Sequence, residues 1–200
     1  QERYFNYETN RDRFKMKKII VVFKLLISYY HKITKAGNEY AKFLGVKVGN
    51  DCRIYTTSFG SEPWLISIGN KVTITSGVQI LTHDGGTWLV EDEKGRREYF
   101  NGVEIGNNVF VGVNSIIMPG VKIEDNVIVA SGSVVTKSVP EGSIIGGNPA
   151  KIIGEFKNYK NKVLKDYVSK SELNFNVSYK ERTMHESSKN KIKPFLKIQS

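Results

Sequence analysis

Aliphatic residues return at every sixth position along residues 103–139. A helix repeats near 3.6 residues and a single strand repeats at two, so a period of six indicates three short extended segments per turn of a solenoid. Each group of six residues, or hexad, is then expected to form one face of a three-sided prism, with aliphatic side chains inside. One inward register consists of Ile105, Val111, Ile117, Ile123, Val129 and Val135, and the second of Val109, Ser115, Val121, Val127, Ser133 and Val139.

Small and turn-forming residues fill the positions between, as at 106–108, 119–120, 124–126 and 131–132. Gly tolerates positive φ, and Asn, Asp and Ser side chains hydrogen-bond to nearby backbone, so these residues suit the corners of a prism. The pattern therefore predicts an all-β solenoid. An ordinary β-sandwich with regular turns is the alternative, and consecutive matches in both registers argue against it.

The hexads begin at Val46 and are interrupted twice before the long regular run. The register slips across residues 59–65, and this slip is expected to turn Glu62 and Trp64 outward. The period stops again for a charged, Gly-rich insertion at residues 84–102. A simple stack needs no such loop, and long loops on rigid scaffolds are commonly functional.

The chain is expected to have three parts: an N-terminal basic helical segment at 1–45, the repeats at 46–153, and a C-terminal helix and polar tail at 154–200. An apolar run at residues 19–27 is interrupted by Lys24 and is well short of the roughly 20 apolar residues that span a bilayer. Two interpretations stay open for the first part: packing against the solenoid or a neighbouring subunit, and peripheral attachment to an anionic membrane. In the last part, residues 155–170 are expected to form the helix, and the residues after Ser171 to pack loosely.

The formal charge of +10 is unevenly distributed. Residues 1–45 carry 10 basic and 4 acidic side chains, residues 46–150 carry 8 and 11, and residues 151–200 carry 12 and 5. Basic ends can meet nucleic acid, anionic lipid or a phosphorylated ligand, but no aromatic-interleaved basic patch or nucleic-acid motif is present, so no nucleic-acid partner is expected. The single cysteine, Cys52, falls on an inward register and excludes an intrachain disulfide, which fits a reducing, cytoplasmic location.

His83 is the last residue before the insertion. An imidazole titrates near neutrality, so it can take a proton from a hydroxyl or amine as that group attacks a thioester. A position at the edge of a rigid coil, facing a loop, would fix the direction of the ring. By itself, one histidine followed by Asp and Gly is a weak signal for catalysis.

The hexads share a pattern: an aliphatic residue, then Gly, Ala, Glu or Asp, and three positions later Ser, Thr, Ala or Val. The run closes with Ile-Ile-Gly-Gly-Asn-Pro-Ala-Lys at residues 144–151. Together these features resemble the hexapeptide-repeat acyltransferases over residues 46–153. The resemblance implies a left-handed parallel β-helix, acetyl-CoA as co-substrate, no metal, and a homotrimer with its three sites at subunit interfaces. Thr-His-Asp-Gly at 82–85 and Gly-Ser-Glu-Pro-Trp at 60–64 are similar to enzymes that O-acetylate sugars of capsules and other surface polysaccharides.

The resemblance also implies roles for individual residues. His83 is the expected general base, and Glu62, about one solenoid turn earlier, would help to position His83 or the acceptor. Asp84 would orient the imidazole or bind a sugar hydroxyl, or would only cap its turn. Trp64 and Trp88 would stack on a sugar ring, with packing between subunits as the alternative. The residues that match the family's coenzyme A site are Ala130, Ser131, Thr136, Lys137, Asn148, Pro149 and Lys151.

Several other functions compete with sugar O-acetylation. The nearest is N-acetylation of a nucleotide-linked amino sugar, but no Gly-rich βαβ fingerprint precedes the repeats. Acetylation of xenobiotics, including antibiotics, comes next. A non-catalytic solenoid would need neither His83 nor the insertion, and a metal-dependent lyase would need three converging histidines where the repeats hold one. Residues 55–61 show no clear match to the acceptor-site Asn of the maltose and galactoside branch, which disfavours those acceptors.

Overall fold

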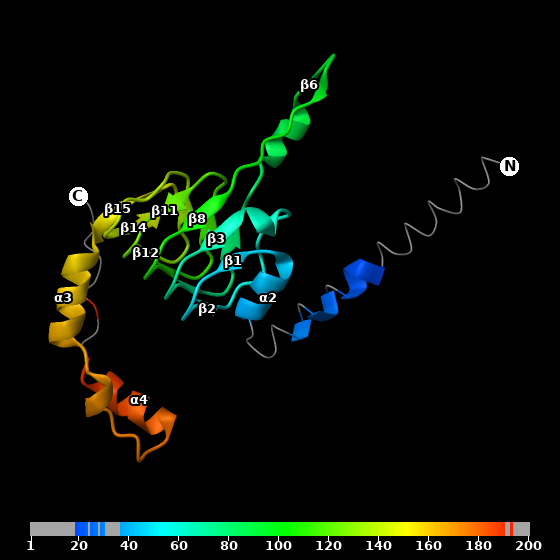
Figure 1. The fold of residues 1–200 in the computed structure, drawn as a ribbon. Coiled ribbons are helices and arrows are strands. Elements are labelled where there is room, and N and C mark those ends of the chain that lie inside the picture. The colour runs from blue at the N-terminus through cyan, green and yellow to red at the C-terminus, as the bar shows by residue number, and fades with distance from the viewer. Residues whose placement is uncertain (1–18, 24, 28, 31–36, 191–192, 194–200) are drawn as a thin grey trace. The chain divides into compact units, whose positions relative to one another are not determined.

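Short strands, most of them two residues long, form where a hexad places an aliphatic residue inward. The computed structural model describes residues 19–23, 25–27, 29–30, 37–190 and 193 (Figure 1). β-Branched inward residues favour an extended backbone, and the turn residues that follow them end each strand. The strands of the repeats are β1 (Lys47–Val48), β2 (Arg53–Ile54), β3 (Ile66–Ile68), β4 (Thr73–Ile74), β5 (Gln79–Ile80), β8 (Val103–Ile105), β9 (Phe110–Val111), β10 (Ile116–Ile117), β11 (Lys122–Ile123), β12 (Ile128–Val129), β13 (Val134–Val135) and β14 (Ser143–Gly147).

The chain passes through three sheets in turn. Sheet A contains β1, β3, β8 and β11; sheet B contains β2, β4, β9, β12 and β14; sheet C contains β5, β10 and β13. Each circuit runs from A to B to C, and each strand pairs in parallel with the strand of the circuit before, as Ile105 does with Ile123 and Ile117 with Val135. These partners are three hexads apart, which confirms three extended segments per turn. β15 (Ala150–Glu155) adds an antiparallel edge strand to sheet B.

The core consists of the side chains that the two registers place inward. All twelve register residues are buried, and so is Cys52. The two buried serines of the second register, Ser115 and Ser133, both donate hydrogen bonds to the carbonyl oxygen of Ala130. A buried hydroxyl with an acceptor costs little, so these serines fit a narrow interior. The predicted registers are therefore confirmed along the whole regular run.

Asparagine side chains form a column at the corner between sheets A and B. Asn70 Oδ1 accepts from the Asn50 backbone N–H at 2.8 Å, Asn107 Oδ1 accepts from the Asn70 N–H at 2.8 Å, and Asp125 Oδ1 accepts from the Asn107 N–H at 2.7 Å. The bond from the Asn107 N–H holds the pKa of Asp125 below its ordinary value. This is the side-chain-to-backbone turn chemistry that the composition of the corners predicts.

The N-terminal helical prediction is confirmed in part. Residues 19–23, 25–27 and 29–30 are helical, and residues 31–36 lie outside the described part of the chain. A separate helix, α2 (Gly37–Leu44), packs on the first circuit with Tyr40 and Ala41 in the core. A Cβ atom at Gly37 would lie 1.9 Å from the Ile54 carbonyl oxygen, so only glycine allows this approach. No helix among the described residues is both long and apolar enough to cross a membrane.

The described residues fall into two compact units, one up to Tyr159 and the other from Lys160 onward. The C-terminal helix expected at 155–170 is present as α3 (Phe156–Asp166). A further helix, α4 (Tyr179–Ser188), follows the short turn η3 (Lys170–Glu172) and was not predicted from the sequence. None of the α4 residues is buried, so the residues after Ser171 are helical in part but loosely packed.

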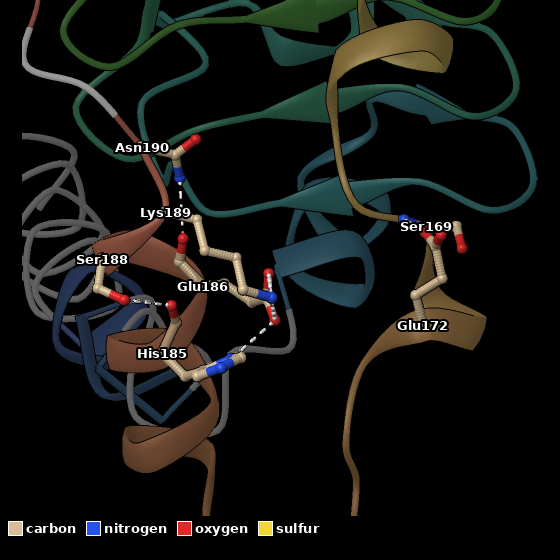
Figure 2. Close-up of polar contacts among 7 residues, drawn as sticks. All are labelled: Ser169, Glu172, His185, Glu186, Ser188, Lys189 and Asn190. Carbon is tan, nitrogen blue, oxygen red and sulfur yellow. Dashed lines mark hydrogen bonds and ion pairs between the residues drawn. The ribbon is translucent and has the colours of Figure 1, made fainter.

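A capping box starts α4. The Ser178 hydroxyl accepts from the Glu181 N–H at 3.2 Å, and the Glu181 carboxylate accepts from the Ser178 N–H at 3.0 Å. This Ser-x-x-Glu spacing is a helix-start signal that the sequence contains. Near the end of the same helix, the Glu186 carboxylate accepts from Lys189 Nζ at 2.9 Å and pairs with His185 Nδ1 at 3.2 Å (Figure 2).

Candidate active site

His83 stands where the chain leaves the sheets for the insertion. It follows β5 at the corner between sheets C and A, and its backbone pairs with Phe100 in an isolated antiparallel bridge. The Asp84 N–H donates to the Tyr99 carbonyl at 3.1 Å, and the Asn101 N–H donates to the Thr82 carbonyl at 2.9 Å. These bonds close the neck of the insertion and fix the backbone on both sides of His83. The loop itself contains η2 (Gly85–Leu89) and a hairpin of β6 (Glu91–Asp92) and β7 (Gly95–Arg96).

Glu62 reaches His83 from the preceding circuit. One carboxylate oxygen, Oε2, lies 3.0 Å from His83 Nδ1 and accepts a 2.6 Å hydrogen bond from Thr82 Oγ1. The slip at residues 59–65 makes this approach, because Gly60 takes a φ of 65° and a Cβ there would lie 2.8 Å from Thr82 Oγ1. The Glu62 side chain is 16% exposed and lies outside the core, as the slip in the register predicts, and its two partners hold it against the corner of the solenoid.

The hydrogen bonds on Oε2 keep Glu62 ionised. The Thr82 hydroxyl, and after it the hydrogen bond and charge of His83, lower the pKa of Glu62, while partial burial acts in the opposite direction. An ionised carboxylate accepts only, so Nδ1 of the neutral imidazole carries its proton toward Glu62 and Nε2 keeps its lone pair. The His83 side chain is 39% exposed. The pair therefore presents an oriented base nitrogen at the surface of the corner.

Asp84 is engaged in its own turn. Its carboxylate accepts from the Gly86 N–H at 2.8 Å, and its carbonyl accepts from Thr87 Oγ1 at 2.9 Å, which caps η2. The imidazole partner in this structure is Glu62. Three roles were considered for Asp84: to orient the imidazole, to bind a sugar hydroxyl or to cap its turn. Its observed contacts are those of a turn cap.

Both tryptophans are exposed, as the sequence predicts for Trp64. Trp64 is 61% exposed and lies in the short turn η1 (Pro63–Leu65), two residues after Glu62. Trp88 is 70% exposed in η2, and the Arg96 guanidinium lies over its ring at 5.0 Å from the centroid. Trp64 is therefore held close to the pair of Glu62 and His83 by its position two residues after Glu62, whereas Trp88 belongs to the inserted loop.

The residues that match the coenzyme A site fall into two groups within one chain. Thr136 and Lys137 follow β13 at the corner between sheets C and A, the corner that carries His83, two circuits further on. With parallel strands about 4.8 Å apart, two circuits correspond to roughly 10 Å. Both side chains are exposed. The structure therefore brings these two residues to the edge of the solenoid that His83 occupies.

The other group lies at the corner between sheets B and C. The Ala130 N–H donates to the Ile145 carbonyl at 2.8 Å, which places Ala130 and Ser131 beside the turn from β14 to β15. That turn contains the cis peptide between Asn148 and Pro149, and Lys151 follows in β15. All of these are exposed except Ala130, which is half-buried. Sheet C separates this group from Thr136 and Lys137.

No cluster of three or more His, Cys, Asp or Glu side chains suited to a metal ion is present in the described part of the chain. Reasoning from the sequence missed Thr82, which is fully buried and anchors Glu62. The sequence contains a signal for this role. Thr82 follows the inward Ile80 by two residues, so the alternation of side chains along a strand turns it inward, and a buried hydroxyl requires a hydrogen-bond acceptor.

The chain is similar to several known proteins. The family model described as bacterial transferase hexapeptide (six repeats) matches residues 102–137. Protein CapG of Staphylococcus aureus is 54% identical over 136 residues, 66% of this chain and 79% of CapG. The galactoside O-acetyltransferase of Escherichia coli is 34% identical over 56% of this chain, and the match spans 55% of that protein. The hexapeptide-repeat acetyltransferase VCA0836 of Vibrio cholerae aligns with a TM-score of 0.46 and 24% identity over 56% of this chain and 63% of the other.

Proposed function

Because the chain belongs to the hexapeptide-repeat acyltransferases, as its match to most of CapG shows, we propose that it moves an acetyl group from acetyl-CoA to a sugar hydroxyl of a capsular or other surface polysaccharide, or of its precursor. The observation that carries the proposal is the Glu62 carboxylate on Nδ1 of a half-exposed His83. A relative named as an O-acetyltransferase, the galactoside enzyme, supports oxygen as the acceptor atom.

His83 acts as the general base in this proposal. Nε2 takes the proton of the acceptor hydroxyl as the oxygen attacks the thioester carbonyl, and Glu62 stabilises the imidazolium that forms. The thiolate leaves and takes that proton as it departs, so the imidazole is neutral again at the end of each turnover. Thr82 keeps Glu62 in place throughout. No covalent enzyme intermediate is needed, and Cys52 is buried away from solvent.

Acetyl-CoA supplies the activated acetyl group. We propose that Lys137 pairs with a phosphate of the donor, since a lysine ammonium is a compact point charge suited to phosphate, and that Thr136 lies beside it. Ala130, Ser131, Asn148, Pro149 and Lys151 would contact the donor from the second corner. Because sheet C separates the two corners within a chain, we propose a homotrimer in which the corners of neighbouring subunits face a shared donor groove. Fully active monomers in sedimentation would contradict this.

The family also carries the finer description of the fold. We propose that the three-sheet winding is a left-handed parallel β-helix spanning residues 46–153, preceded by a helical segment at 1–45 and followed by a C-terminal part at 154–200. Trp64 and Trp88 would contact the sugar in this arrangement.

We propose further that the first part attaches the protein to the inner face of the cell membrane. Nine large apolar or aromatic side chains between residues 19 and 30 are 51–67% exposed. The basic excess of residues 1–45 complements anionic lipid. Flotation with vesicles containing phosphatidylglycerol tests this: the full chain should float with the anionic vesicles and not with vesicles of phosphatidylcholine alone. Equal behaviour with both would contradict the proposal.

The experiment that tests the transferase measures thiol release from acetyl-CoA with a panel of bacterial surface glycans and nucleotide sugars. We expect release that depends on a glycan and is lost in a folded His83→Ala variant. Full activity of that variant would refute His83 as the base. Acceptance only of amino sugars, with acetyl found on nitrogen, would replace O-acetylation by N-acetylation.

A further inference from the structure

A groove of about 410 Å³ runs across the outer face of sheet A. The outward residues of its four strands stand in register, Lys47 beside Ser67, Ser67 beside Glu104, and Glu104 beside Lys122. Their neighbours in each strand point into the core, so these four side chains point outward. Parallel strands lie about 4.8 Å apart, so the row is roughly 14 Å long. A row of this length is an extended binding surface rather than a compact pocket.

One rim of the groove is joined to the His83 pair. Trp64 lines the groove and follows Glu62 by two residues in the same turn. Asn101 also lines it, and its N–H donates to the carbonyl of Thr82, the residue before His83. A ligand lying along the row would therefore run toward the corner that carries the base.

The chemistry of the lining fits a chain of sugars. Glu104 supplies a hydrogen-bond acceptor, Lys47 and Lys122 supply donors, and Ser67 and Asn101 can supply both. Trp64, 61% exposed at the rim, offers a flat apolar face of the kind that the faces of sugar rings cover. The Lys122 ammonium is already paired with Glu124 at 2.9 Å, so the row is not a concentrated anion site for phosphates.

A second, larger groove is lined differently. It has a volume of about 680 Å³ and lies on the outer face of sheet B, where the outward residues in register are Arg53, Thr73, Phe110, Ile128 and Ile144. The Arg53 guanidinium donates to the Thr73 hydroxyl at 3.0 Å, and the other three side chains offer no hydrogen bonds to hydroxyl groups. The outward row is therefore polar along its whole length only on sheet A, and the groove of sheet A is the one that adjoins the His83 pair.

We propose that the outer face of sheet A is a subsite for the acceptor chain, which binds the sugar units next to the one that is acetylated. The substrate class that follows is an oligosaccharide or polysaccharide rather than a single sugar. This inference rests on the proposed function, because it uses His83 as the point where the acceptor hydroxyl reacts.

Binding is measured without acetyl-CoA, using fluorescently labelled fragments of bacterial surface polysaccharides one, three and six sugar units long. At least one fragment series is expected to bind about tenfold more tightly at six units than at one. Ser67→Tyr should fill the groove and remove this gain from length. Gln79→Tyr, at the corresponding outward position of sheet C, is the matched control and should keep the gain. If Ser67→Tyr fails to fold, Glu104→Gln and Lys122→Ala, both at exposed positions, test the same row.

Three results would overturn the subsite: no binding of any fragment, no gain from length in the wild type, or a gain that survives in Ser67→Tyr or is lost equally in Gln79→Tyr. The proposed function fails separately. Length-dependent binding without thiol release would leave the subsite standing and refute the transferase, whereas release that ignores chain length would refute only the subsite.

Discussion

Replacing Glu62 by glutamine tests the histidine–carboxylate pair with the least change of shape. Both hydrogen bonds of the pair, from Thr82 at 2.6 Å and with His83 at 3.0 Å, end on the same oxygen, Oε2. The single carbonyl oxygen of glutamine can therefore take both positions. The variant removes the negative charge and keeps the geometry, so its activity reports what the charge contributes.

The expected loss follows from that difference. A hydrogen bond to an ionised group is about twice as strong as one between neutral groups, which amounts to about 1–2 kcal/mol when His83 becomes an imidazolium in the transition state. The imidazole is 39% exposed, which argues against a larger value. A change of about 1–2 kcal/mol corresponds to roughly a 5- to 30-fold decrease in kcat/KM. Glu62→Ala removes both bonds and leaves the buried Thr82 hydroxyl unsatisfied, so its loss should be clearly larger.

Thiol release at saturating acetyl-CoA, with the acceptor varied, gives these ratios. Glu39→Gln, an exposed site in the first turn of α2, is the control for a charge lost elsewhere and should match the wild type. Equal kcat/KM for Glu62→Gln and the wild type would refute a role for the charge. Equal losses in Glu62→Gln and Glu62→Ala would refute the argument that one carbonyl oxygen preserves the geometry.

Three further predictions concern the anchor, the core and the donor. Because the pKa of Glu62 is lowered in the folded protein, its contribution to stability is present above the ordinary glutamate pKa and is lost as the pH falls through the lowered value. Thr82→Val should therefore reduce the free energy of unfolding by about 1–3 kcal/mol at pH 7, and this difference should shrink as the pH falls below the ordinary glutamate pKa and through the lowered one. Thr82→Ser should restore both stability and kcat. A gap that persists unchanged at low pH would contradict this. Val127→Asp puts an unpaired charge into a fully buried position and should prevent folding; soluble protein with the circular dichroism of the wild type would contradict the register. Lys137→Ala should raise the KM for acetyl-CoA roughly fivefold and leave the KM for the acceptor unchanged, and no change in the former would remove Lys137 from the donor site.

The regular part of this fold could be predicted from the sequence because one physical rule repeats. A period of six determines which side chains point inward, and all twelve residues of the two inward registers between Ile105 and Val139 are buried. The helix α4 was not predicted although Ser178 and Glu181 form a capping box at its start. None of its residues is buried, so its sequence has no apolar residues repeating with a helical period. Where burial does not select residues, only the local capping signal remains.

The site was predicted less completely because its contacts join residues of different circuits, about 20 positions apart in the sequence, and the local spacing of residues does not show such contacts. His83 stands out by its type and its place before the insertion. Glu62 was expected near it, but the sequence does not show that Gly60 bends the backbone toward Thr82 and so brings the carboxylate onto the Thr82 hydroxyl. Thr82 itself has the pattern of an ordinary inward residue, and its role depends on a carboxylate that the chain brings back from one circuit earlier.

The proximity of Glu62 and His83 can be predicted if each interruption of the repeat is assigned to the two sheets between which it falls. The slip at 59–65 falls between Ser58, which bridges to β5 in sheet C, and β3 in sheet A. The insertion at 84–102 falls between β5 in sheet C and β8 in sheet A. Both interruptions therefore lie at the same corner in consecutive circuits, and one carries Glu62 while the other follows His83. In a winding this regular, two irregularities that stack at one corner must face each other across a single strand spacing, about 4.8 Å. One circuit of the solenoid consists of three hexads, so each interruption of the repeat can be assigned to one corner of the prism. Interruptions that fall at the same corner in consecutive circuits therefore predict the position of the site, which the regular hexads do not show.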